Sequence, residues 1–215
     1  MVRLLIVRHG LSLTNKDKRY TGQRDVPLAP LGLLQGEAVS RYIAENYKVD
    51  AIYASDLSRA VDTLAPLSAH LSLPIKRCAG LREISLGDWE GKTYEEVKSL
   101  YPETYALLKT ARHLVRYEGG ESYREAYDRA VGAFLAIARE NEGKTVAVVS
   151  HGGTIRLFLS KVMGLPYEER NGNTPAISNA SLTAVEIDGE DMRLVFAGED
   201  GYLGTLTEAV DPNLH

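Results

Sequence analysis

Residues 4–10 read Leu-Leu-Ile-Val-Arg-His-Gly, and this stretch decides the class of fold. Four apolar residues that end in charge and glycine are typical of a strand buried in a parallel sheet. Two other runs have the same character, Ala51-Ile52-Tyr53-Ala54 and Thr145-Val146-Ala147-Val148-Val149. The second of these is rich in β-branched residues, which favour strands. We therefore predict a mainly parallel sheet that contains these three strands.

Helical patterns separate the predicted strands. Pro30 suits the first turn of one helix, and residues 60–71 read as another, which we expect Pro66 to end or kink. Ser122-Tyr123-Arg124-Glu125 is a capping box and predicts the start of a long helix. Thr154–Met163 reads as a further helix. The alternation of strands and helices predicts an α/β fold.

Two segments depart from this alternation. Residues 181–187 and 192–196 are joined by Asp188-Gly189, which predicts an antiparallel hairpin. A homodimer formed through the edge of this hairpin is one assembly that we expect the chain could adopt. Between residues 86 and 120 the pattern loosens into short helices and loops, so we predict a lid-like insertion there.

The composition is that of an ordinary globular protein, with 215 residues, 44% of them hydrophobic, 25% charged, and a formal net charge of −4. No linker or repeat divides the chain, so we predict a single domain over residues 1–215. The mild acidity argues against nucleic acid as a partner. No apolar run approaches about 18 residues, so we expect no membrane partner. Cys78 is the single cysteine, which excludes a disulfide framework and fits a cytoplasmic protein.

The residues that follow the three predicted strands are cations and hydrogen-bond donors. Arg8 and His9 follow the first strand, Arg59 lies five residues after the second, and His151 follows the third. Ligands of open α/β sheets bind beyond the carboxyl ends of the strands, so these side chains should meet at one edge. The helix that begins near Thr154 should point its free N–H groups at the same place. This edge predicts a site for an anion, and a phosphoryl group is the best candidate.

A phosphomonoester site needs a nucleophile, a proton for the leaving oxygen and stabilisation of the other phosphoryl oxygens. A neutral imidazole can be the nucleophile and would give a phosphohistidine intermediate. Arginines and a protonated imidazole can supply the stabilisation, so we expect neither a cofactor nor a metal, whose dication the arginines would repel. Glu83 is one candidate for the general acid.

Residues 5–10, which end in Arg8-His9-Gly10, resemble the Arg-His-Gly motif of the histidine phosphatase superfamily, the phosphoglycerate mutase-like enzymes. Further matching stretches follow in order, at Asn15, Thr21-Gly22, residues 55–63, Leu81-Arg82-Glu83, residues 87–91, residues 119–122 and residues 150–153. The resemblance implies a three-layer α/β/α fold with one antiparallel strand, and a phosphoric monoester hydrolase. Leu11-Ser12 and Thr14 depart from the family pattern, which affects only the outer pocket.

The resemblance also implies a role for each matching residue. His9 would be the phosphorylated nucleophile, and Arg8, Arg59 and His151 would hold the phosphoryl oxygens. Glu83 would protonate the leaving oxygen and later activate water. Asn15 and the Gly152 backbone would add donors, and the substrate side would be lined by Thr21, Gly22 and Gln23.

Three functions stay open at this point. The first is a phosphatase that acts on small phosphorylated metabolites, the second a phosphoglycerate mutase, and the third a phosphoanion-binding scaffold without turnover. The segment between Glu83 and His151 is compact, and Leu86 stands where the mutases usually carry a tyrosine, so the phosphatase is favoured. The substrate is not readable from the sequence. Several cations could favour a second anionic group on it, namely Arg82, Lys92, Arg112, His113 and Arg116.

Overall fold

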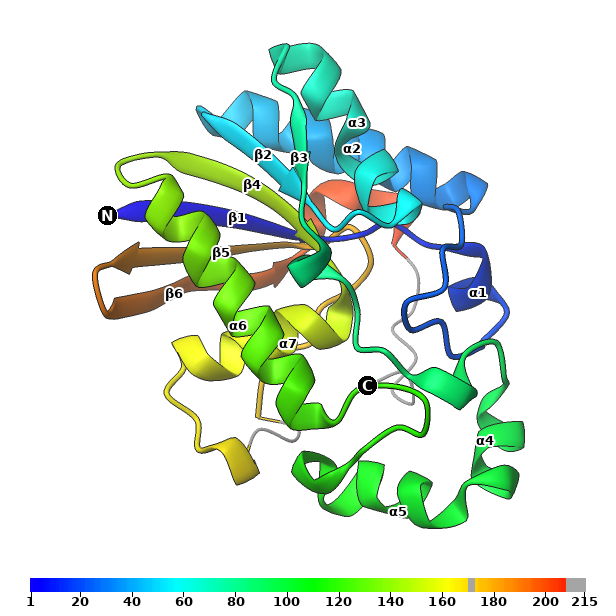
Figure 1. Cartoon of the computed structure of the whole chain (residues 1–215). Coiled ribbons are helices and arrows are strands. Elements are labelled where there is room, and N and C mark those ends of the chain that lie inside the picture. The colour runs from blue at the N-terminus through cyan, green and yellow to red at the C-terminus, as the bar shows by residue number, and fades with distance from the viewer. Residues whose placement is uncertain (170–172, 208–215) are drawn as a thin grey trace.

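A six-stranded sheet forms the centre of the computed structural model, which describes residues 1–169 and 173–207 (Figure 1). The strands lie in the order β3-β2-β4-β1-β5-β6. Their bounds are β1 (Val2–Arg8), β2 (Ala51–Ala54), β3 (Ile75–Arg77), β4 (Thr145–Ser150), β5 (Leu182–Asp188) and β6 (Asp191–Glu199). Strands β1 to β4 pair in parallel, and β5 runs antiparallel to both β1 and β6. The predicted mainly parallel sheet with one antiparallel strand is confirmed.

Helices cover both faces of this sheet. The pair α2 (Pro30–Asn46) and α3 (Ser58–Leu71) packs on one face, and the pair α6 (Tyr123–Glu140) and α7 (Gly152–Val162) packs on the other (Figure 1). Alternate residues of β1 serve the two faces, since Leu4 belongs to the core under α6 and α7, whereas Leu5 belongs to the core under α2 and α3. A strand buried on both sides has no polar alternation, and this explains its continuous apolar run.

The capping box at Ser122 is confirmed, because the Ser122 hydroxyl accepts a bond from the Glu125 N–H and the Glu125 carboxylate accepts one from the Ser122 N–H. The expected break at Pro66 is wrong, since α3 continues through it to Leu71. Leu64 and Leu67, on either side of Pro66, are fully buried against the sheet. Their burial stabilises the helix by about 1.5–3 kcal/mol each, which offsets the loss of one backbone hydrogen bond.

Two other elements differ from the sequence prediction. The edge strand β3 was not predicted, because three residues that are half-buried or exposed carry no clear pattern. Helix α7 begins at Gly152, two residues before the predicted start. The hairpin of β5 and β6 is confirmed, and β6 forms an edge of the sheet, so the edge-strand homodimer stays a prediction. In the part of the chain that the structure describes, no helix is long and apolar enough to cross a membrane.

Residues 86–120 contain four short helices and turns, η2 (Gly87–Trp89), α4 (Tyr94–Leu100), α5 (Pro102–Thr110) and η3 (Arg112–Leu114). Figure 1 shows α4 and α5 beyond one end of α6. The fully buried Trp89 holds them together, with aromatic contacts to Tyr20 and Tyr117 at 5.3 and 5.0 Å between ring centroids. This aromatic core makes the segment a wall beside the sheet edge where β1 and β4 end.

Candidate active site

The register of the sheet brings His9 and His151 together. Arg8 in β1 pairs with Ser150 in β4, so the two histidines are the next residues on adjacent parallel strands. Their ring centroids lie 4.9 Å apart. The His9 Nδ1 lies 2.7 Å from the carbonyl oxygen of Gly10, which can only accept, so this nitrogen carries the proton. The Nε2 lone pair of His9 is left for a reaction.

Arg8 and Arg59 lie beside these histidines and are almost completely buried, at 6% and 1% exposed. Arg8 donates from Nη1 to the Ile177 carbonyl, and Arg59 donates to the carbonyls of Arg24 and Gly22. These bonds orient the guanidinium groups but leave both buried Nε atoms without a partner in the described residues. Both ring nitrogens of His151 are also buried and have no hydrogen-bond partner among the described residues. Buried donors without partners are rare, and oxygen atoms of a bound anion would satisfy them.

Burial governs the charges of this cluster. It lowers the pKa of His9 well below the ordinary value, and repulsion from Arg59 and then Arg8 lowers this pKa further. The pKa of His151 is lowered in the same way by burial and by Arg59. Burial also lowers the pKa of Arg59 to about 10, which leaves that side chain charged at neutral pH. The free site therefore pairs neutral imidazoles with cationic guanidinium groups. The protonated imidazole expected from the sequence would require a bound anion.

Glu83 lies at the N-terminus of α7. Its carboxylate accepts bonds from the N–H groups of Gly153 at 3.0 Å and Thr154 at 3.1 Å, and from the Thr154 hydroxyl. We expected these N–H groups to face the anion, but they hold Glu83 instead. The helix N-terminus attracts negative charge, so it fixes this carboxylate in place beside the histidine cluster.

The backbone around Glu83 is held by Arg129, which the sequence analysis missed. Its guanidinium donates to the carbonyls of Gly80, Arg82 and Glu83 and pairs with Glu121 at 2.7 Å. Arg129 lies in the middle of α6, and the residues around it form no recognisable motif. The local sequence therefore does not indicate its role. Its role is to position the Glu83 segment rather than to contact a substrate.

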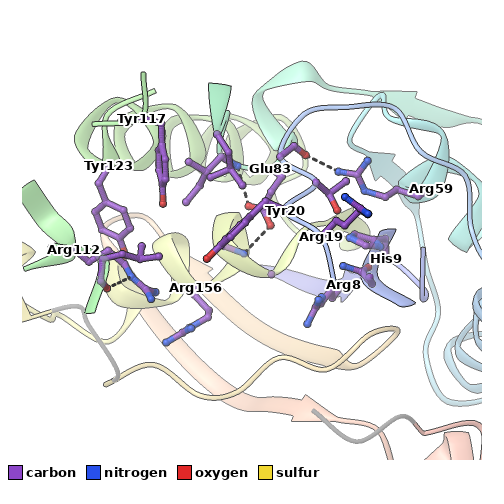
Figure 2. A pocket seen from close by; sticks show the side chains of 18 of the residues that line it. Arg8, His9, Arg19, Tyr20, Arg59, Glu83, Arg112, Tyr117, Tyr123 and Arg156 are labelled. Carbon is purple, nitrogen blue, oxygen red and sulfur yellow. Dashed lines mark hydrogen bonds between the residues drawn. The ribbon is translucent and has the colours of Figure 1, made fainter. Parts of the chain in front are cut away.

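A pocket opens in front of these residues (Figure 2). The expected residues His9, Arg8, Arg59, Glu83, Asn15, Thr21, Gly22 and Gly152 line it. His151 lies behind His9 and is fully buried, and Gln23 does not line the pocket. The Gln23 amide donates to the Glu83 carbonyl instead. Lining residues that the sequence analysis did not single out include Arg19, Tyr20, Tyr117, Tyr123, Arg156 and Thr174.

The sequence model of the histidine phosphatase superfamily (branch 1) matches residues 4–200. The chain belongs to this superfamily. The Arabidopsis thaliana phosphoglycerate mutase-like protein 4 is 34% identical over 206 residues, which cover 93% of this chain and 86% of the relative. The metal-independent phosphoserine phosphatase of the same plant is 30% identical, over 87% of this chain and 77% of its own. The solved structure of Bacillus stearothermophilus YhfR superposes with a TM-score of 0.89 at 29% identity, over 94% of this chain and 100% of its own.

The buried histidines should make this histidine phosphatase less stable in acid. A histidine whose pKa is lowered by folding takes up its proton first in the unfolded chain, so stability is complete above about pH 6.5 and falls below it. We expect His9 and His151 each to remove up to about 1.4 kcal/mol per pH unit as the pH falls towards 5. Urea unfolding at a series of pH values measures this slope.

The control for this slope compares two histidines. His9→Gln should reduce the slope by about half, because one of the two buried imidazoles is gone. The same replacement of the exposed His70 in α3 should leave the slope as it is. An unchanged slope in His9→Gln would contradict the burial argument.

A methyl group at Gly153 should disturb the phosphatase through Glu83. An ideal Cβ at Gly153 would lie 2.6 Å from Glu83 Oε1, so Gly153→Ala must displace the carboxylate from its N–H donors. Misplacement of a catalytic group by about 1 Å can cost on the order of 100-fold in rate, and we expect kcat to fall at least about 10-fold. The matched control is Gly132→Ala within α6, where nothing lies within 4 Å of the added methyl. This control should keep full activity, and a fully active Gly153→Ala would refute the placement of Glu83.

Proposed function

We propose that this protein hydrolyses small phosphomonoesters through a phosphohistidine on His9, without a metal ion. The observation that carries the proposal is the group of buried, unpartnered nitrogens of Arg8, Arg59 and His151 around the free Nε2 side of His9. Such a group fits the oxygens of a phosphoryl group. Among the residues that the structure describes, five arginines line the pocket and supply the positive charge a metal would otherwise bring. The similarity to the metal-independent phosphoserine phosphatase of Arabidopsis thaliana supports the same conclusion.

The first half of the proposed reaction transfers the phosphoryl group to the enzyme. The His9 Nε2 lone pair forms a bond to phosphorus while the bond from phosphorus to the ester oxygen breaks. Glu83 gives its proton to that oxygen, so the alcohol leaves neutral. Arg8, Arg59 and a His151 that takes up a proton beside the dianion hold the other oxygens, and Asn15 and the Gly152 N–H add donors.

The second half returns the enzyme to its starting state. Glu83, now ionised, takes a proton from water, and the water oxygen bonds to phosphorus. The bond between phosphorus and His9 Nε2 breaks, inorganic phosphate leaves, and His151 gives up the proton that it took up beside the dianion. The Gly153 and Thr154 N–H groups keep the Glu83 carboxyl in one position through both steps.

A phosphoglycerate mutase is the second candidate, because the plant relative at 34% identity is called phosphoglycerate mutase-like. A mutase returns the phosphoryl group to a bound substrate, whereas a phosphatase gives it to water. Glu83 lines a partly open pocket that water can enter, which favours water as the acceptor. We also propose a cytoplasmic location, which the single, free Cys78 supports.

The experiment that tests this function measures phosphate release from p-nitrophenyl phosphate and a panel of metabolite phosphomonoesters, with and without a chelator. We expect release from several esters at an unchanged rate in the chelator. Fast isomerisation of 3-phosphoglycerate, primed with 2,3-bisphosphoglycerate and with little free phosphate, would replace the phosphatase by the mutase. Loss of activity in the chelator that a divalent ion restores would refute the metal-independent mechanism. No release from any ester would leave the anion-binding scaffold as the function.

A further inference from the structure

Two arginines at the far end of the pocket form no ion pair with any residue that the structure describes. Arg112 in η3 and Arg156 in α7 line the pocket, and Figure 2 shows them at the opposite end from His9 and Arg8, with Tyr20 between. Arg112 donates from Nε to the Leu108 carbonyl at 3.3 Å, and Arg156 donates from Nε to the Thr174 hydroxyl at 2.8 Å. Within residues 1–169 and 173–207, no carboxylate forms an ion pair with either guanidinium.

The neighbouring arginines outside the pocket are different. Arg82, Arg116 and Arg129 pair with Asp56, Glu125 and Glu121 at 2.6, 2.8 and 2.7 Å. Arg156 is half-buried, and its pKa is lowered by that burial and by repulsion from Arg112. Two like charges that face each other in a sheltered pocket destabilise each other unless an anion joins them. The unpaired positive charges of Arg112 and Arg156 are therefore typical of a site that binds an anion.

The wall between the two ends of the pocket is mostly apolar. It is made of Ile84, Leu86, Leu108 and the rings of Tyr20, Tyr117 and Tyr123. Glu83, which the proposed reaction uses at the phosphoryl end, is the single carboxylate among the lining residues that the structure describes. A ligand that spans the pocket therefore meets cations at both ends and carbon in the middle.

We propose that Arg112 and Arg156 form a subsite for a second anionic group, a carboxylate or a second phosphate, on the alcohol part of the substrate. This inference rests on the proposed phosphatase function and gives it a substrate class, acidic phosphomonoesters. Planar guanidinium groups bind both kinds of anion with paired hydrogen bonds. The Thr174 hydroxyl, which accepts from Arg156, is held close enough to contact the same group.

Helix α7 contributes residues to both ends of the pocket. Gly152 and Gly153 lie at the phosphoryl end and Arg156 follows one turn later, so their backbones are separated by about 5–6 Å along the helix. A chain of a few bonds or one ring can bridge the two ends. Both short aliphatic and aryl phosphates therefore serve as probes.

The experiment compares kcat/KM within matched pairs that differ only in the second anion. The pairs are phosphoserine and its carboxamide, 4-carboxyphenyl phosphate and 4-carbamoylphenyl phosphate, and an alkanediol bisphosphate and its monophosphate. We expect at least one charged member to exceed its neutral partner about 10-fold or more, the gain of a charge-assisted pair. The carboxylate and bisphosphate pairs show which anion the subsite takes.

The variants Arg112→Met and Arg156→Met should reduce this preference to nearly equal rates, and Arg156→Lys should restore part of it. The preference is the ratio of kcat/KM for the two esters of a pair, measured on the same protein. Turnover of the neutral ester therefore shows that the variant is folded and active. Arg116→Met, which removes an exposed arginine outside the pocket, should keep the full preference. Equal rates in every pair, or a preference that survives both variants, would overturn the subsite while phosphate release upholds the phosphatase. No turnover of any ester would overturn both.

Discussion

Replacing His9 by glutamine should abolish phosphate release, with kcat reduced by about 10⁴-fold or more. The reason is that His9 supplies the one atom that bonds to phosphorus, the Nε2 whose lone pair is left free by the bond between Nδ1 and the Gly10 carbonyl. Glutamine has a similar length but no nucleophilic nitrogen. Phosphate release from p-nitrophenyl phosphate under saturating conditions measures the loss.

The fold should survive this replacement. His9 directly follows β1, whose stability comes from its apolar residues, and burial lowers the pKa of His9, so the imidazole opposes folding in acid. Circular dichroism and the urea midpoint at pH 7.5 should therefore match the parent protein. His70→Gln in α3 is the matched control and should keep full activity. A His9→Gln variant with more than about 1% of the parental rate would exclude the phosphohistidine route.

Replacing Glu83 by glutamine should slow turnover by about 10²–10⁴-fold, and the loss should depend on the leaving group. Alkyl phosphates expel a strongly basic alkoxide that needs the Glu83 proton, so their first step should suffer most. p-Nitrophenolate leaves without a proton, so its release should be affected far less in the first turnover. The amide keeps the size of the carboxyl group, but its one oxygen can accept from only one side of the site, so either the Gly153 N–H or the Thr154 N–H loses its acceptor.

Rapid-quench kinetics separate the two steps in this variant. Hydrolysis of the phosphohistidine also needs Glu83, as a base, so p-nitrophenyl phosphate should give a burst of nitrophenolate followed by slow turnover. The quenched protein should carry an acid-labile, base-stable phosphoryl group. Glu37→Gln, an exposed change in α2, is the control and should behave as the parent protein. Equal losses for alkyl and nitrophenyl esters, without a burst, would show that Glu83 is not the proton donor.

Local patterns in the sequence were sufficient for much of the fold. Continuous apolar runs marked β1, β2 and β4, and the capping box at Ser122 marked the start of α6. These signals are readable because burial on two faces and the capping of free N–H groups depend on a few adjacent residues. The same reasoning could not foresee that α3 passes through Pro66, since packing with the sheet decides that point.

The chain by itself also determined which chemistry the site can hold, because it sets Arg8, His9, Arg59 and His151 at strand ends and helix starts. Only the tertiary structure decided how they meet. The parallel register of β1 and β4 aligns His9 with His151, and the N–H groups of α7 bind Glu83. It also gathered Arg112 and Arg156 from distant segments. Such contacts join residues that are far apart in the chain, so neither local periodicity nor a capping pattern predicts them. They are specified only by the packing of the layers.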